Sequence, residues 1–155
     1  MTFYSVDPVR FGVGLSGTTT SLGANDPEVG TTVRAGDEEY VFVYNAGNSQ
    51  ISPTYGAVLS AVTGYSVTVS SVAGDLLAGV CKNATIATGE YGWLVTKGFA
   101  TVEMAADYSA AAGSKLALAA DGEFDIVSGA GVPTLGKVME ATASGASGSA
   151  YIRVN

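Results

Sequence analysis

The chain has 155 residues, of which 47% are hydrophobic, 14% are charged and 21 are glycine, and its formal net charge is −7. This length predicts one domain that can bury its own core, and because Lys and Arg are nowhere clustered we expect neither nucleic acid nor a membrane as partner. Histidine is absent and there is one cysteine, so the commonest general base, the commonest metal ligand and an intramolecular disulfide are missing. We therefore expect no enzyme, no metal site and no cofactor.

The charged fraction is low, against about 25% in an average soluble protein. Two interpretations follow: a surface covered by partner proteins, or a neutral surface without special use. The N-terminus has neither a basic region nor an apolar run, so we expect no secretory signal.

Residues 1–30 show no periodic pattern and predict an extended N-terminal arm. Pro8, Pro27 and several glycines interrupt this segment. Aromatic side chains in a segment without its own core need a surface to pack on. Phe3, Tyr4 and Phe11 are therefore the candidate contact residues, against the parent domain, a neighbouring subunit or another protein.

Residues 12–17 match G-x-G-x-x-G, the spacing of a dinucleotide-binding turn, and Asp37–Glu39 follows about twenty residues later. That turn needs a buried strand before it and a helix after it. Here a proline-interrupted segment precedes Gly12 and a run of Thr and Ser follows Gly17. The match is therefore interpreted as a coincidence in a glycine-rich chain.

Residues 31–155 predict a single all-β domain, a compact β-sandwich or small β-barrel of about ten short strands. Short helical turns are expected at 83–88 and 108–112. Lys97-Gly98 and Asp121-Gly122 are expected to form hairpin turns. The predicted strands are rich in β-branched and aromatic residues and cover 32–34, 39–44, 51–61, 65–70, 77–81, 91–96, 99–104, 115–118, 123–128, 135–141 and 149–154.

Four features are weighed as possible sites. Asp121–Asp125 lacks the full series of calcium ligands and is interpreted as an acidic hairpin. Asp37–Glu39 is interpreted as a solvated turn, with a weak cation site between subunits left open. Cys81 lies in an apolar run and is interpreted as a buried small hydrophobic side chain, with a reactive thiol as the alternative. Trp93 is interpreted as a core residue, with a sugar-stacking platform as the alternative.

The second half of the chain, from Gly79 to the C-terminus, shows an ordered series of motifs. It contains GEYGWLV at 89–95, GFATV at 98–102, AAGSKL at 111–116, LGKVMEA at 135–141 and AYIRV at 150–154. This half resembles the head decoration (cement) proteins of tailed bacteriophages. The resemblance implies a small β protein without enzymatic activity, commonly a trimer on the outside of the capsid.

The resulting hypothesis is a structural virion protein, made in the host cytoplasm, that binds the major capsid protein on the outer capsid surface as a homotrimer. Phe3, Tyr4 and Phe11 would then reach the shell or a sister subunit, for example by adding a strand to an exposed sheet edge. The alternative hypothesis is a glycan- or host-surface-binding β-sandwich module on a virion, acting through Trp93 and tyrosines.

Overall fold

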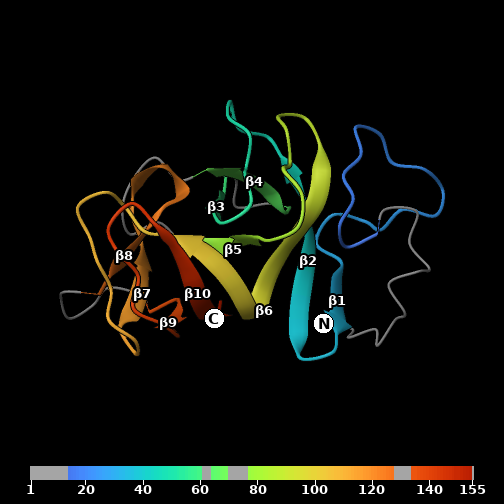
Figure 1. Cartoon of the computed structure of the whole chain (residues 1–155). Coiled ribbons are helices and arrows are strands. Elements are labelled where there is room, and N and C mark those ends of the chain that lie inside the picture. Colours follow the sequence, from blue (N-terminus) through green and yellow to red (C-terminus); the bar gives the residue numbers. More distant parts are fainter. Residues whose placement is uncertain (1–13, 61–63, 70–76, 128–133, 155) are drawn as a thin grey trace.

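The computed structural model describes residues 14–60, 64–69, 77–127 and 134–154, and the fold is all-β, as predicted (Figure 1). Within these residues, ten strands join in one hydrogen-bonded sheet. Their bounds are β1 Thr32–Ala35, β2 Glu38–Asn45, β3 Gly56–Leu59, β4 Ser66–Val69, β5 Leu77–Cys81, β6 Tyr91–Glu103, β7 Lys115–Leu118, β8 Phe124–Ile126, β9 Gly136–Val138 and β10 Ser147–Arg153.

The first half of the sheet closes into a five-stranded barrel. Its order is β2-β4-β3-β5-β6, and the antiparallel pairing of β2 with β6 completes the ring. The β2–β4 pair is parallel, whereas the other pairs are antiparallel. The interior is filled by apolar side chains, namely Val41, Val43, Ile51, Ala57, Val67, Ala78, Cys81, Ile86 and Leu94. Closure protects the strand edges that an open sheet of this length would expose.

Strand β6 is one continuous strand of 13 residues, so the predicted hairpin turn at Lys97-Gly98 is wrong. The two predicted strands on either side of that turn are the two halves of β6. Gly98 has φ +121 and lies two residues after Thr96, the extra residue of β6 at the register shift opposite Glu39 and Tyr40 of β2. A glycine and a bulge at one point bend a strand rather than reverse it. The first half of β6 therefore pairs with β2, and the second half leaves the barrel.

The second half of the sheet is built on that outgoing part of β6. Its order is β6-β10-β9-β7-β8, and a parallel bridge from Met104 to Phe124 brings β8 back beside the end of β6. This ring, together with Val58, Leu77 and Val80 of the first barrel, surrounds a second core. Its largest fully buried side chains are Phe124, Met104, Leu116 and Ile152. Both rings thus share β6, and Figure 1 shows this strand crossing the middle of the molecule.

The described part of the predicted arm, residues 14–30, lies against the outer side of β2 and β6. Leu15 packs on a third apolar cluster that contains Val33, Phe42 and Trp93. Thr19 forms an antiparallel bridge with Tyr91 through hydrogen bonds of 3.1 and 2.8 Å. This segment therefore covers one wall of the first barrel.

The two predicted helical turns are wrong. Ile86, inside the first of them, forms an antiparallel bridge with Ile51, and Ala110, inside the second, forms one with Thr142. In both places backbone groups pair across the fold instead of along the chain. A single turn of helix gains too few hydrogen bonds to compete with such pairing. Among the described residues, no helix is long and apolar enough to cross a membrane.

Candidate interaction surface

The three predicted contact residues, Phe3, Tyr4 and Phe11, lie outside the described residues. Gly12, the first glycine of the G-x-G-x-x-G string, also lies outside them. Residues 14–17 of the string form a turn, in which the Gly17 amide donates to the Gly14 carbonyl at 2.8 Å. Thr19 then pairs with Tyr91, so a strand-like segment follows where a nucleotide site would need a helix N-terminus.

Cys81 and Trp93 are both core residues. The Cys81 side chain is fully buried, its Sγ lies 3.1 Å from the Ala84 carbonyl oxygen, and burial raises the pKa of its thiol to about 12. Trp93 is 4% exposed and its ring lies 4.9 Å from that of Phe42. Sugar stacking needs an open ring face, so the alternative prediction of a platform at Trp93 is wrong.

The acidic turn at 37–39 is tied to lysines. Glu38 forms an ion pair with Lys82 and accepts a hydrogen bond from the Tyr40 hydroxyl. Burial opposes the charge of Glu38, but the hydrogen bonds from Lys82 and Tyr40 prevail and lower the pKa of its carboxyl. Glu39 pairs with Lys97 at 3.1 Å. These carboxylates are occupied in holding β2 to its neighbours, and no group of three or more metal-ligating side chains occurs in the described part of the chain.

A row of large side chains crosses the outer face of the second ring. Directly opposed residues in antiparallel strands share a face, and Phe99 on β6 is opposite Tyr151 on β10, which is opposite Lys137 on β9, which is opposite Lys115 on β7. Alternation explains the row, because Ala150 and Ile152 of the same β10 point into the core. The Phe99 and Tyr151 rings meet edge to face, with centroids 5.3 Å apart.

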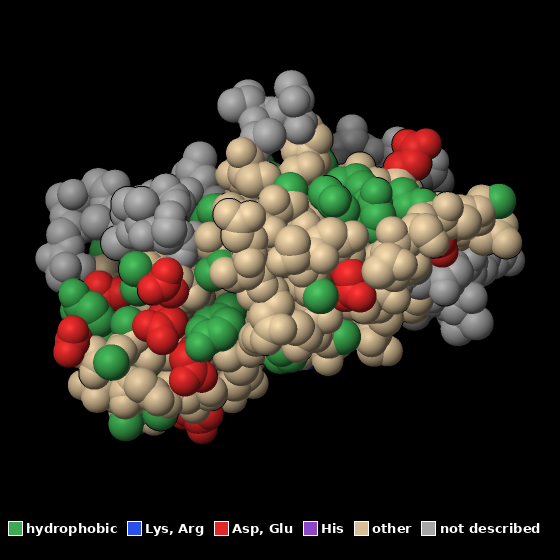
Figure 2. Space-filling view, turned by 90° about the horizontal axis from the view of Figure 1, so that it is seen from above, with side chains coloured by type: hydrophobic (Ala, Val, Ile, Leu, Met, Phe, Trp, Pro, Cys, Tyr) green, Lys and Arg blue, Asp and Glu red, His purple; other side chains and the backbone are tan. Residues whose placement is uncertain are grey.

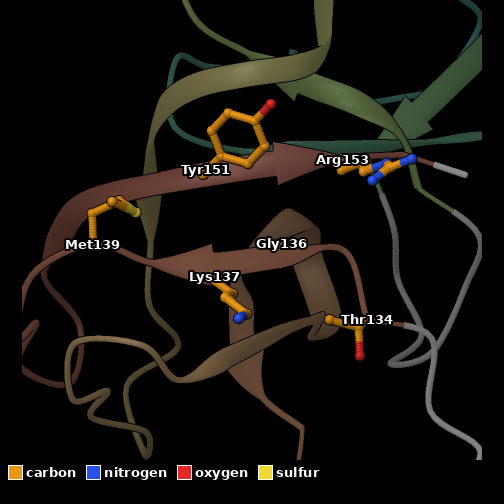
Figure 3. A pocket seen from close by; sticks show the side chains of 6 residues that line it. All are labelled: Thr134, Gly136, Lys137, Met139, Tyr151 and Arg153. Atoms are coloured by element: carbon orange, nitrogen blue, oxygen red, sulfur yellow. The ribbon is translucent and has the colours of Figure 1, made fainter.

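Beside this row lies a pocket of about 490 Å³ (Figure 3). It is lined by Thr134, Gly136, Lys137, Met139, Tyr151 and Arg153. Met139 is 50% exposed and Phe99, just beyond the pocket, is 52% exposed. Aromatic residues, Met and Arg are the side chains enriched in the cores of protein interfaces. We call this surface, defined by Phe99, Lys115, Lys137, Met139, Tyr151 and Arg153, the cationic face.

The sequence did not reveal the cationic face. Its charged members, Lys115, Lys137 and Arg153, lie about twenty residues apart along the chain. Predicting the strands does not predict which strands pair or which residues are opposed across a pair. The alternation of GFATV and SAYIR was the available signal, since it leaves Phe99, Tyr151 and Arg153 on one side of their strands. Only the pairing of four strands places those sides together.

Comparison with solved structures finds a match for this fold. The matched chain is the N base of the head fiber gp8.5 of bacteriophage phi29, with a TM-score of 0.56 over 75% of this chain and 96% of that chain. The fold is similar to that of a phage head-fiber base. Identity is 13%, so the likeness is one of fold. No protein-family model matches the sequence, and no curated protein does.

Proposed function

We propose that this chain is a non-enzymatic structural protein of a phage head, a decoration protein that binds the major capsid protein on the outer capsid surface as a homotrimer. The observation that carries the proposal is the similar fold: the structural match covers 96% of the chain of a phage head-fiber base. The resemblance of residues 79–155 to cement proteins supports the same role independently of that fold.

The described architecture suits a part in an assembly. The β2–β6 pairing closes the first barrel, and the Met104–Phe124 bridge brings the ends of the second ring together, so few strand edges of the described residues are free. Many copies bound to one lattice act multivalently, so each contact can be individually weak.

Cosedimentation with empty capsids of the phage that encodes the chain tests this proposal. The full chain is expected to pellet with capsids and to stay in the supernatant without them. A full-length variant carrying Phe3→Ala, Tyr4→Ala and Phe11→Ala is expected to lose most of this binding, because each large apolar anchor buried at an interface contributes on the order of 2 kcal/mol. Tyr108→Ala is the matched control, since Tyr108 is a 40% exposed aromatic of the β domain.

The two outcomes are separable. A full chain that never pellets with capsids overturns the decoration role. A triple variant that pellets as the native chain does overturns the anchoring role of the three aromatic residues and leaves capsid binding in place.

A further inference from the structure

The pocket beside the row of large side chains has the size and the lining of a ligand site. Its volume of about 490 Å³ lies within the range of about 300–1,000 Å³ that is typical of small-ligand pockets. Figure 3 shows the Tyr151 ring between Met139 and Arg153, with Lys137 on the neighbouring strand. The pocket therefore offers an aromatic ring, a thioether and two cations to one occupant.

The Tyr151 ring is held in place without a ligand. Phe99 meets it edge to face, with ring centroids 5.3 Å apart, and its strand β10 is paired with β6 on one side and β9 on the other. An added Cβ on Gly136 would lie 2.2 Å from the Tyr151 carbonyl oxygen, so glycine allows β9 to approach β10 this closely. A side chain that is already ordered loses little conformational entropy when a ligand binds.

The two cations of the pocket have no carboxylate partner among the described residues. Two ion pairs occur among those residues, and both involve the acidic turn at 37–39. None of the residues that line the pocket is acidic. Figure 2, a view from above, shows Asp and Glu side chains but no Lys or Arg side chain of the described residues, so Lys137 and Arg153 lie on another side of the molecule. Ammonium and guanidinium groups form their strongest hydrogen bonds with carboxylate or phosphate oxygens.

Carboxylates on the same side of the sheet lie outside the pocket. Glu103 ends β6 opposite Ser147, whose hydroxyl donates to it, and its position is about 13 Å along the strand from the row of large side chains. Strand β7 separates Asp125 of β8 from β9, a distance across the sheet of about 10 Å. Glu140 accepts a hydrogen bond from the Ser149 amide at 3.1 Å. The positive charge is therefore local to the pocket and comes from its two lining cations.

The pocket presents side chains and no free backbone edge. In the described sheet, β10 is paired with β6 and β9, and β9 is paired with β10 and β7. An extended peptide binds a sheet by adding main-chain hydrogen bonds at a free edge, and these strands have none to offer. A compact sugar ring needs no such edge, because its apolar face packs on an aromatic ring and an anionic substituent accepts hydrogen bonds from cations.

We propose that this pocket binds a saccharide unit that carries an anionic group, a carboxylate or a phosphate. The apolar face of the sugar ring packs on Tyr151 and Met139. The anionic oxygens accept hydrogen bonds from Arg153 and Lys137. The site is distinct from the stacking platform that the sequence suggested at Trp93, which is buried. This binding activity is additional to the proposed structural role and does not depend on it.

Nuclear magnetic resonance titration of the full, isotope-labelled chain tests the site. Trigalacturonate supplies a carboxylate and mannose 6-phosphate a phosphate, and the methyl ester of trigalacturonate and mannose are their neutral controls. At least one anionic saccharide is expected to shift the amide resonances of residues 134–139 and 151–153 saturably. It is expected to bind about tenfold or more tighter than its own neutral control, because the control cannot form the charge-assisted hydrogen bonds. Triglutamate, which has carboxylates but no sugar ring, is expected to bind more weakly than that saccharide.

Substitutions separate the pocket from general charge attraction. Lys137→Gln with Arg153→Gln is expected to weaken binding of the anionic saccharide about tenfold or more. Lys115→Gln is the matched control, because Lys115 is an exposed lysine directly opposite Lys137 that does not line the pocket. It is expected to change the affinity less than about threefold, since solvent screens an exposed charge outside the site. Circular dichroism checks that each variant is folded.

Four results would overturn the inference: no saturable shift at the pocket with either anionic saccharide, neutral controls that bind as tightly, triglutamate that binds more tightly than both saccharides, or a Lys115→Gln variant that loses as much affinity as the double variant. The titrations of the native chain stand even where a variant does not fold. None of these results bears on capsid cosedimentation, so failure of the saccharide site and failure of the decoration role are told apart.

Discussion

Asn45 is fully buried at the end of β2, yet all the polar atoms of its side chain have partners. Its Nδ2 donates to the carbonyl oxygens of Ser49 and Ile86, both at 2.9 Å, and its Oδ1 accepts from the Gly47 amide at 3.0 Å. The bond to Gly47 is local and lies where the chain leaves β2. The bond to Ile86 joins residues 41 positions apart and has no signature in the sequence.

Asn45→Asp is expected to lower the free energy of unfolding by about 2–3 kcal/mol. The substitution replaces the donor amide with a carboxylate oxygen that faces two carbonyl oxygens and buries a charge. Urea denaturation at pH 7 measures the loss. Asn48→Asp, the same change at an exposed position of the same turn, is expected to alter stability by less than about 0.5 kcal/mol; equal losses for the two variants would contradict this account.

At the scale of elements, Gly98 decides how the two rings are connected. Its φ of +121 disfavours any residue with a side chain, and an added Cβ would lie 3.1 Å from the Glu38 Cα and 2.7 Å from the Glu38 Cγ. The sequence pattern Lys-Gly between two apolar runs is typical of a hairpin turn, which explains the mistaken prediction. The structure uses the same glycine for a close approach of β6 to β2.

Gly98→Ala is therefore expected to destabilise the fold by on the order of 1–3 kcal/mol. Gly113→Ala isolates the contribution of backbone strain, because Gly113 has φ +85 but nothing lies within 4 Å of its added Cβ. Thermal denaturation of both variants makes the comparison. If Gly113→Ala lowers the stability as much as Gly98→Ala does, the crowding against Glu38 contributes nothing to the loss of stability.

At the scale of the whole molecule, the shared strand β6 links two separate cores. Trp93, the one tryptophan of the chain, belongs to the cluster on the first barrel, whereas Val102 of the same strand and Met104, the residue directly after that strand, are buried in the core of the second ring. Because β6 contributes side chains to both cores, loss of packing in one core is expected to destabilise the other. Unfolding is therefore expected to be one cooperative transition.

Met104→Ala tests this coupling. Truncating a fully buried methionine is expected to remove about 2–5 kcal/mol of stability, and the midpoint followed by Trp93 fluorescence should fall together with the midpoint followed by far-ultraviolet circular dichroism. A Trp93 transition that stays at the native midpoint while part of the dichroism signal is lost earlier would show that the rings unfold independently.

The sequence by itself determined the class of the fold and the side chains of the core. Alternating β-branched and aromatic residues specify strands locally, and Cys81 and Trp93 are buried because apolar neighbours surround them in the chain. Closure of the rings, the bend at Gly98 and the gathering of Lys115, Lys137 and Arg153 were decided by the tertiary structure alone. The physical reason is register: opposed residues meet through hydrogen bonds between distant strands, and no local pattern of side chains encodes which strands will pair.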